Sequence, residues 1–396
     1  GIPILPIDDA GQLNAYPLMR VSAAVSGENV ANLDVVLPVA SEADCQNCHE
    51  MGQIGASDGN IDYMPPPADA TDTNAVLQAA KHNILVLHDN KHGTNLLNQK
   101  PVLCASCHYS AALDLAGTGP TNTLPKMSEV MMSEVMHGHH GELTDSTGAP
   151  LFPTNGTLEE TCYQCHPGKI TKCLRGAMGG AGIDCVDCHG SMLAVGSSTR
   201  EPWLDEPRCE SCHTGDAVKN DGDIRLNQAW SDHVDVATPR LASNKRFAEN
   251  TSTLYRNSLG HGDVACEGCH GSTHAIWPNA MPTANDNVAA NQLQGHSGTI
   301  TECSVCHTSL PLTLNGPHGM HNVNSRTWNL EHEGFYESNP DACRACHGQN
   351  LEGTVLSRTA ADRDYLRDDE DDEGGAQTIN VAKGTQVSCS LCHERP

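Results

Sequence analysis

Cysteine and histidine recur together along this chain in one fixed order. Eighteen of the 19 cysteines form nine Cys-x-x-Cys pairs, and a histidine directly follows each pair. On one helical turn, residues i, i+3 and i+4 share a face. Two thiols can then each form a thioether to a porphyrin vinyl group while the adjacent imidazole reaches the iron. Cys-x-x-Cys-His is the attachment pattern of c-type haem, and the sequence predicts nine covalently bound haems c. In chain order, motifs one to nine are Cys45/Cys48/His49, Cys104/Cys107/His108, Cys162/Cys165/His166, Cys185/Cys188/His189, Cys209/Cys212/His213, Cys266/Cys269/His270, Cys303/Cys306/His307, Cys343/Cys346/His347 and Cys389/Cys392/His393.

Two other uses of paired cysteines fit this pattern less well. A disulfide framework would not require a histidine after each second cysteine. Zinc ribbons use Cys-x-x-Cys units in twos, whereas nine is odd. We therefore expect both cysteines of each motif to hold the haem by thioethers, and the motif histidine to be the proximal iron ligand. Cys173 is left without an internal disulfide partner, and we expect it to be a buried, inert thiol.

Thirteen histidines lie outside the motifs, more than nine irons require as second axial ligands. Most of them stand close to a motif in the sequence; His274, for example, follows His270 by four residues. The predicted distal ligands are His88, His137, His140, His261, His274, His296, His318, His321 and His332. Four further histidines could replace one of these: His82, His92, His139 and His233. The sequence leaves open which distal histidine serves which haem.

Some of the predicted distal ligands come in closely spaced pairs. His137 and His140 are expected on one face of a helix that runs through Ser128–Met136, and His318 and His321 are likewise three residues apart. Methionine as the sixth ligand would raise the reduction potential of the haem iron. The 11 methionines, however, are not placed near the motifs as the histidines are. An iron with two imidazole ligands has no position left for substrate. The predicted role is therefore outer-sphere electron transfer rather than catalysis.

The composition leaves little material for an ordinary core. Aromatic residues make up 4% of 396 residues and the mean hydropathy is −0.41, which is thin for a chain of this length. Haem faces would supply the apolar surface that aromatic side chains normally bury. The expected fold is mostly irregular, with short α-helices wrapped around a chain of stacked c-type haems and a small β element near the N-terminus.

The motifs divide the chain into two unequal parts. Residues 1–44 carry no haem motif, and Tyr16–Val25 and Asn32–Pro38, on either side of Gly27, are expected to form a hairpin or two short strands. Residues 45–396 form the multihaem region. Within that region the run Asp368–Glu373 is read as a solvated acidic loop, with a cation site as the alternative.

The charge and hydropathy of the chain argue against nucleic-acid partners and against a membrane span. The net charge of −26 disfavours nucleic acid and anionic membrane surfaces. No stretch approaches 18 consecutive apolar residues, so no membrane span is predicted. Because the chain starts at Gly1 rather than methionine, we expect that a targeting segment has been removed and that the protein is exported.

Several segments resemble those of secreted multihaem cytochromes c from metal-reducing bacteria. They are ILVLHDNKHGT, PVLCASCHYSAALDLAGTGP, TCYQCHPGKITKCLRGAM, CEGCHGSTHAIWP, GPHGMHNVNSRTW and GTVLSRTAADRDY, and the resemblance runs from about Tyr16 to the C-terminus. It implies bis-histidine haems, an extracellular or outer-surface location, and electron delivery to minerals, other extracellular acceptors or other electron-transfer proteins. Some proteins of this broad group polymerise into cytochrome nanowires.

Three functional hypotheses follow. The first is an extracellular electron conduit, with polymerisation into a conductive filament of identical subunits as its expected form. The second is a monomeric outer-surface or periplasmic electron carrier. The third is a multihaem oxidoreductase with one open haem; nitrite reductases of this kind resemble each other in using Cys-x-x-Cys-Lys at that haem, and no motif here ends in lysine.

Overall fold

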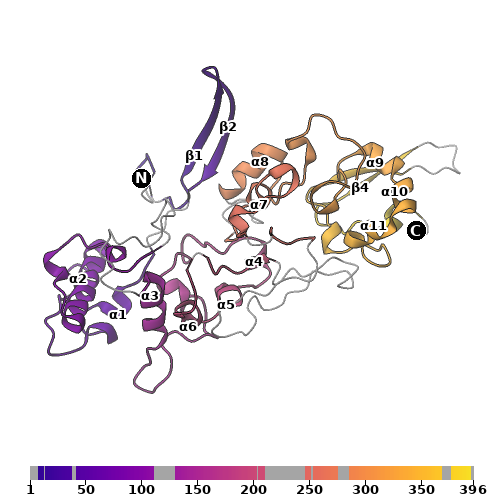
Figure 1. Ribbon diagram of the computed structural model, residues 1–396. Coiled ribbons are helices and arrows are strands. Elements are labelled where there is room, and N and C mark those ends of the chain that lie inside the picture. Colours follow the sequence, from indigo (N-terminus) through magenta and orange to yellow (C-terminus); the bar gives the residue numbers. More distant parts are fainter. Residues whose placement is uncertain are drawn as a thin grey trace. The chain divides into compact units, whose positions relative to one another are not determined.

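The computed structural model describes residues 8–12, 14–37, 42–110, 130–202, 204–209, 246–250, 253–274, 285–367 and 376–393. These residues form short helices and single helical turns joined by irregular segments, with two small antiparallel hairpins (Figure 1). The predicted fold class, including a small β element near the N-terminus, is confirmed. The second hairpin and the length of one helix, α2, were not predicted.

The described regular elements have the following bounds. The strands are β1 Leu18–Val25, β2 Glu28–Val36, β3 Arg363–Arg367 and β4 Gln377–Val381. The α-helices are α1 Gln46–His49, α2 Thr73–His92, α3 Met132–Gly141, α4 Ala177–Gly180, α5 Cys185–His189, α6 Met192–Val195, α7 Cys266–His270, α8 Val288–Gln294, α9 Arg326–Glu331, α10 Glu333–Ser338 and α11 Pro340–His347. Single 3₁₀ turns include η3 Cys104–Ser106, η5 Cys162–Gln164, η10 Cys303–Val305, η11 Pro317–Gly319 and η13 Cys389–Leu391. None of the helices in these described ranges is both long and apolar enough to cross a membrane.

The N-terminal hairpin pairs β1 with β2 around a two-residue turn. Ser26 and Gly27 both have positive φ, 52° and 87°, as a turn that matches the twist of a hairpin requires. Its base is held by Asp34, whose backbone N–H donates to the side-chain oxygen of Gln292 in α8 at 2.9 Å. All eight residues of β1 are exposed.

The longest helix, α2, has clear start and stop signals. Asp72 caps its N-terminus by accepting a hydrogen bond from the Ala75 N–H, and Gly93 ends it in the left-handed conformation. Inside the helix, the fully buried Asn83 donates to the carbonyl oxygen of His49 at 2.9 Å. This bond fixes α2 against the end of the first motif.

The chain divides into two compact units that do not follow the order of the sequence. One unit comprises Gly1–Val39, Cys173–His189 and Leu204–Pro396, and the other comprises Ala40–Lys172 and Gly190–Trp203. We call them the hairpin unit and the α2 unit. The predicted boundary at residue 44, drawn from the haem motifs, stays a prediction.

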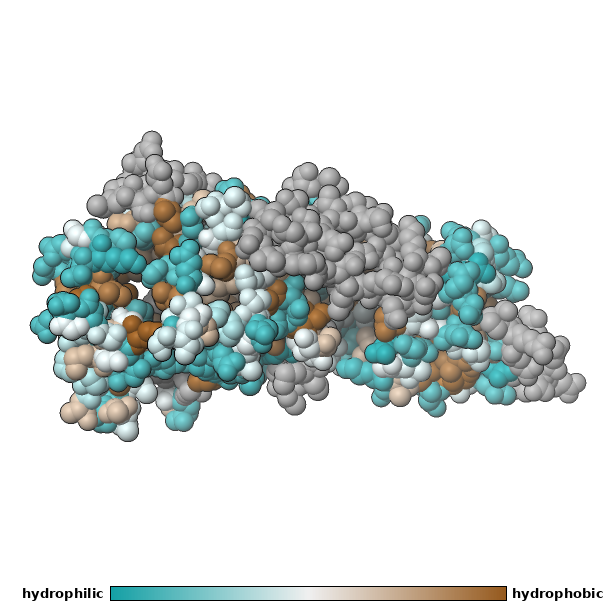
Figure 2. All heavy atoms as spheres, turned by 90° about the horizontal axis from the view of Figure 1, so that it is seen from below, coloured by the Kyte–Doolittle hydropathy of each residue, from teal (hydrophilic) through white to brown (hydrophobic). Residues whose placement is uncertain are grey.

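The protein core is thin. Thirteen hydrophobic residues are buried in the described part of the chain, and seven of these are alanines. Figure 2 shows hydrophobic residues as small scattered patches among hydrophilic ones on the visible face. Side chains alone thus bury little apolar surface, as the composition predicted.

Candidate haem centres

The described motifs fold as helical turns. Motifs one, four, six and eight end short α-helices, and motifs two, three, seven and nine lie on 3₁₀ turns. In the 3₁₀ motifs the backbone N–H of the histidine still donates to the carbonyl of the first cysteine, as from His166 to Cys162 at 2.8 Å. The two cysteines and the histidine of each motif therefore share one face. Of motif five only Cys209 is described; Cys212 and His213 lie outside the described residues.

The second cysteine of a motif takes one of two positions. Cys188 and Cys346 lie inside helices α5 and α11, whereas Cys107 and Cys306 directly follow the turns η3 and η10. The expected helical turn is present at each of these motifs, and its form is 3₁₀ at motifs two and seven. The backbone N–H of Cys107 and that of Cys306 each donate to the carbonyl of their motif's first cysteine, at 3.1 and 3.2 Å. A bond over three residues closes a 3₁₀ turn, which is the usual form of so short a helical piece.

None of the described motif cysteines is joined in a disulfide. We expect a thioether to haem at Cys107, Cys188, Cys306 and Cys346, as at the other motif cysteines. This stays a prediction. Three described motif cysteines are exposed: Cys104, Cys165 and Cys306. The others are half-buried: Cys45, Cys48, Cys107, Cys162, Cys185, Cys188, Cys209, Cys266, Cys269, Cys303, Cys343, Cys346, Cys389 and Cys392.

These thiols do not gather into a metal cluster of their own. In the described ranges, no group of three or more cysteine, histidine or carboxylate side chains is placed to hold a metal ion. A haem iron requires only two axial ligands from the protein, because the porphyrin supplies its other four nitrogens. A pair of histidines on opposite sides of the ion is therefore a sufficient donor set.

Eight motif histidines each face one histidine from outside the motifs. The two ring centres are 5.8 to 6.5 Å apart in every case. In order of the motifs, the pairs are His49 with His140 (6.4 Å), His108 with His88 (6.5 Å), His166 with His137 (5.8 Å), His189 with His274 (6.1 Å), His270 with His318 (5.8 Å), His307 with His261 (5.9 Å), His347 with His321 (6.5 Å) and His393 with His332 (5.8 Å).

This spacing fits one metal ion between the two rings. Metal–imidazole bonds of about 2 Å on opposite sides of an ion separate the bonded nitrogens by about 4 Å; the further distance to each ring centre gives about 6 Å in total. Direct stacking of two rings would bring their centres closer, as it does for His321 and Trp328 at 4.4 Å. The donor set thus suits an iron with two axial imidazoles.

Hydrogen bonds orient the paired rings for this role. A ligating histidine usually donates its second ring N–H to a carbonyl or similar acceptor. Here the Nδ1 atoms of seven paired histidines lie within hydrogen-bond distance of a backbone carbonyl or a hydroxyl, which leaves Nε2 for the metal. The contacts are His88 to Thr94 (2.9 Å), His108 to Val130 (3.2 Å), His137 to Ser133 (2.8 Å), His140 to Met136 (2.7 Å), His318 to Arg246 (2.8 Å), His332 to Trp328 (3.0 Å) and His347 to Val387 (2.8 Å).

Burial favours the neutral form of the paired rings. Desolvation lowers the pKa of His49, His137 and His274 below the usual histidine value, and it does the same for His88 and His347. At His137 the hydrogen bond to Ser133 opposes this shift without reversing it. Neutral imidazole is the form that binds metal, so these rings are poised as ligands at pH 7.

In the α2 unit, two helices connect three motifs. Helix α2 carries His88, the partner of motif two, and its Asn83 holds the end of motif one. Helix α3 carries both His140 and His137, the partners of motifs one and three. The helix thus contains both histidines, but it begins at Met132, later than predicted, because the backbone of Met131 is extended. The two rings face different motifs.

Motifs one and three also contact each other directly. The side chain of Asn47 donates to that of Gln164 at 2.8 Å, and the backbone N–H of Asp44 donates to the Gln164 carbonyl at 2.8 Å. The α2 unit therefore places motifs two, one and three in a series joined by short protein segments.

The hairpin unit repeats this arrangement. Residues 270–274 contain the motif six histidine and His274, the partner of motif four. Residues 318–321 contain the partners of motifs six and eight. Trp328 then contacts the partners of both motif eight and motif nine. Motifs four, six, eight and nine thus form a second series.

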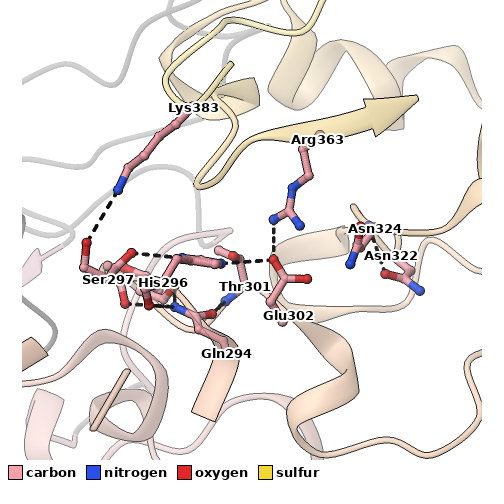
Figure 3. A network of polar contacts seen from close by, with 11 residues as sticks. Gln294, His296, Ser297, Thr301, Glu302, Asn322, Asn324, Arg363 and Lys383 are labelled. Atoms are coloured by element: carbon pink, nitrogen blue, oxygen red, sulfur yellow. Dashed lines mark hydrogen bonds and ion pairs between the residues drawn. The ribbon is translucent and has the colours of Figure 1, made fainter. Parts of the chain in front are cut away.

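His296 is placed differently from the other predicted distal ligands (Figure 3). Its Nδ1 lies 3.0 Å from the Ser297 carbonyl and its Nε2 lies 3.1 Å from a carboxylate oxygen of Glu302. Glu302 also forms a buried ion pair with Arg363. Burial by itself would raise the pKa of Glu302, but the hydrogen bonds from Arg363 and His296 hold it below its usual value. Both ring nitrogens of His296 are thus engaged by acceptor oxygens.

The remaining sequence predictions divide into those described and those outside the described residues. His92 packs against His88 at 4.8 Å and His139 against His140 at 5.4 Å. In the described ranges, no ring contact joins His82, His92 or His139 to a motif histidine. Cys173 is half-buried and forms no disulfide. His233 and the run Asp368–Glu373 lie outside the described residues.

Comparison with known proteins found one family model that matches part of the chain. Residues 181–358 match the family model of the outer membrane cytochrome MtrC/MtrF-like kind, domains II/IV. The resemblance to outer-surface multihaem cytochromes is confirmed. The matched stretch covers somewhat less than half of the chain and contains motifs four to eight. Neither the curated proteins nor the solved structures gave a match.

This match supports a multihaem cytochrome with covalently bound c-type haems. Nine complete motifs predict nine haems per chain. The intact mass of the mature protein should exceed the polypeptide mass by nine haem groups, and acid–acetone extraction should remove none of them because thioethers are covalent. Eight or fewer haems on the mature protein would contradict this count.

Proposed function

We propose that this protein is a nonahaem electron conduit that acts outside the cell or at its outer surface. The observation that carries the proposal is the set of eight histidine pairs, each with one motif histidine and ring centres 5.8 to 6.5 Å apart. A c-type haem bound between such a pair would take up and release one electron at its iron. Two imidazoles leave the iron no position for a substrate, so the protein is not an enzyme in this proposal.

The arrangement of the pairs supports conduction within each unit. Short segments such as 137–140 and 318–321 each present histidines to two motifs. Rigid connections of this kind hold neighbouring sites at fixed spacing, which pre-organises them for transfer. Minerals, other extracellular acceptors and electron-transfer proteins are the proposed partners.

The distal ligands follow from the pairs. We assign His88, His137, His140, His261, His274, His318, His321 and His332 to the eight described motifs. His296 is replaced in this assignment because its two nitrogens already face Ser297 and Glu302. His233 is then our candidate for motif five, and its replacement by alanine should produce one high-spin haem.

The ring planes give a sharp spectroscopic test. Three pairs have nearly parallel rings, at 7°, 11° and 23°, and five have crossed rings, at 59° to 80°. Low-spin ferric haems with parallel imidazoles give rhombic electron paramagnetic resonance signals, whereas crossed imidazoles shift the largest g value upward. The ferric protein should show both kinds, with the crossed kind in the majority.

A substantial high-spin signal from the unmodified protein would contradict complete bis-histidine ligation. It would favour the alternative of a multihaem oxidoreductase with one open haem. An entirely rhombic spectrum would contradict the pairing described above while leaving electron transfer as the role.

We further propose that the chain polymerises into a filament through its N-terminal hairpin. Leu18, Met19, Val21, Val25 and Val30 are 42–63% exposed on this hairpin, and a lone two-stranded hairpin is marginally stable in water. A neighbouring copy could cover these side chains, and a head-to-tail contact that does not close generates a filament. The net charge of −26 opposes association, so screening by salt should favour it.

Electron microscopy at physiological and low salt tests this proposal. Filaments should form at physiological salt, and the double substitution Val25→Asp and Val30→Asp should abolish them by adding charge to the covered surface. Val264→Asp, at a valine 43% exposed elsewhere, should leave them intact. A single species with the mass of one chain and no fibres would favour the monomeric carrier.

A further inference from the structure

One indole lies between the distal histidines of two motifs. The ring of Trp328 is stacked on that of His321, with ring centres 4.4 Å apart and planes 7° apart. The same ring lies 6.2 Å from that of His332, with planes 26° apart. His321 faces the motif eight histidine and His332 faces the motif nine histidine. Trp328 therefore contacts two neighbouring sites at once.

Trp328 is itself firmly held. It lies in the short helix α9 and is only 7% exposed. Its backbone N–H donates to the hydroxyl of Ser325, the N-terminal cap of that helix, at 3.1 Å. Phe335 packs against the indole at 5.0 Å with planes 39° apart. The indole is therefore buried and packed, and it has little freedom to rotate.

The two histidines depend on Trp328 in different ways. The Nδ1 atom of His332 bonds to the backbone carbonyl of Trp328 at 3.0 Å. The ring of His321 is buried and interacts with the backbone of Asn322. Its Nδ1 atom makes no contact as well formed as those of the seven paired rings named above. The stack on the indole, with planes 7° apart, is therefore a main constraint on the plane of His321.

We propose that Trp328 is a positioning residue shared by two haem centres, where it fixes the ligand planes at motifs eight and nine. It holds the ring of His321 nearly parallel to that of His347, at 11°. It also supports the crossed arrangement of His332 and His393, at 67°. Because ligand-plane angle influences the electronic state of a low-spin iron, one residue sets this property at two successive centres. This inference rests on the bis-histidine ligation proposed above.

The test compares three variants of the full-length holoprotein by electron paramagnetic resonance. Trp328→Leu keeps an apolar side chain but removes the flat ring. In the difference spectrum against the unmodified protein, it should displace two of the nine signals: one of the rhombic kind and one of the crossed kind. Trp328→Phe keeps a flat ring and should restore both signals toward their original positions. Phe335 contacts the indole but not the ring of His321 or His332 in the described ring contacts. The substitution Phe335→Leu should therefore leave the spectrum unchanged.

Stability and spectrum separate positioning from simple packing. If Trp328 only filled space, Trp328→Leu and Phe335→Leu would both lower the melting temperature while the signals of the folded protein stayed in place. That result would overturn the inference. Its failure is distinguishable from that of the proposed function, because loss of bis-histidine ligation would appear as high-spin haem in the unmodified protein.

Discussion

Replacing His140 by alanine is expected to convert one haem in nine from low spin to high spin. The ring of His140 lies 6.4 Å from that of His49, and its Nδ1 contact with the Met136 carbonyl at 2.7 Å directs Nε2 toward the first motif. Alanine removes the imidazole but preserves helix propensity in α3, so the change acts on the ligand rather than on the helix. Water or an added ligand can then occupy the vacated position.

The measurements for this variant are spectroscopic. The ferric protein should gain a high-spin signal from one haem per chain, the reduced protein should bind one carbon monoxide per chain, and added imidazole should restore the low-spin spectrum. The neighbouring substitution His139→Ala provides the matched control, because His139 is exposed and its ring contacts His140 rather than a motif histidine. If the two variants have the same spectrum, the assignment of His140 is wrong.

Substituting Gly196 by alanine is expected to damage two haem centres together. A Cβ atom at this position would lie 2.2 Å from the backbone nitrogen of Gly138 and 2.8 Å from the backbone carbon of His137. Helix α6, which ends just before Gly196, packs directly on α3. Since both neighbours are backbone atoms, the methyl group can be accommodated only if α3 moves. That helix carries both His137 and His140.

The expected cost is about 1–3 kcal/mol of unfolding free energy, as for other overpacked sites, together with high-spin signal from up to two haems. Thermal denaturation and electron paramagnetic resonance measure the two effects. Gly59→Ala is the matched control. Gly59 lies in the same unit as Gly196, and a Cβ atom added there would have no other atom within 4 Å. Unchanged stability and spin state in Gly196→Ala would show that the close approach of α3 and α6 does not position the ligands.

Local patterns in the sequence determined the cofactor class and the local structure of this protein. A c-type motif is a single helical turn, so its chemistry and its fold are both written within five residues, as in Cys162–His166. The hairpin around Gly27 follows from two short apolar segments and a turn residue that tolerates positive φ. The shortage of aromatic residues likewise predicted the thin protein core, since that property depends on composition and not on topology.

Only the tertiary structure decided which histidine faces which motif. His274 stands four residues after His270 but faces His189, and His261 stands just before motif six but faces His307. The physical reason is that a motif turn and its nearest neighbours approach a haem from one side. The ligand on the opposite side must come from another segment that passes behind it. Which segment does so depends on packing over long sequence distances, such as the contact between Gly138 and Gly196. Burial against Glu302 and Arg363 likewise set His296 apart from the histidines it resembles in sequence.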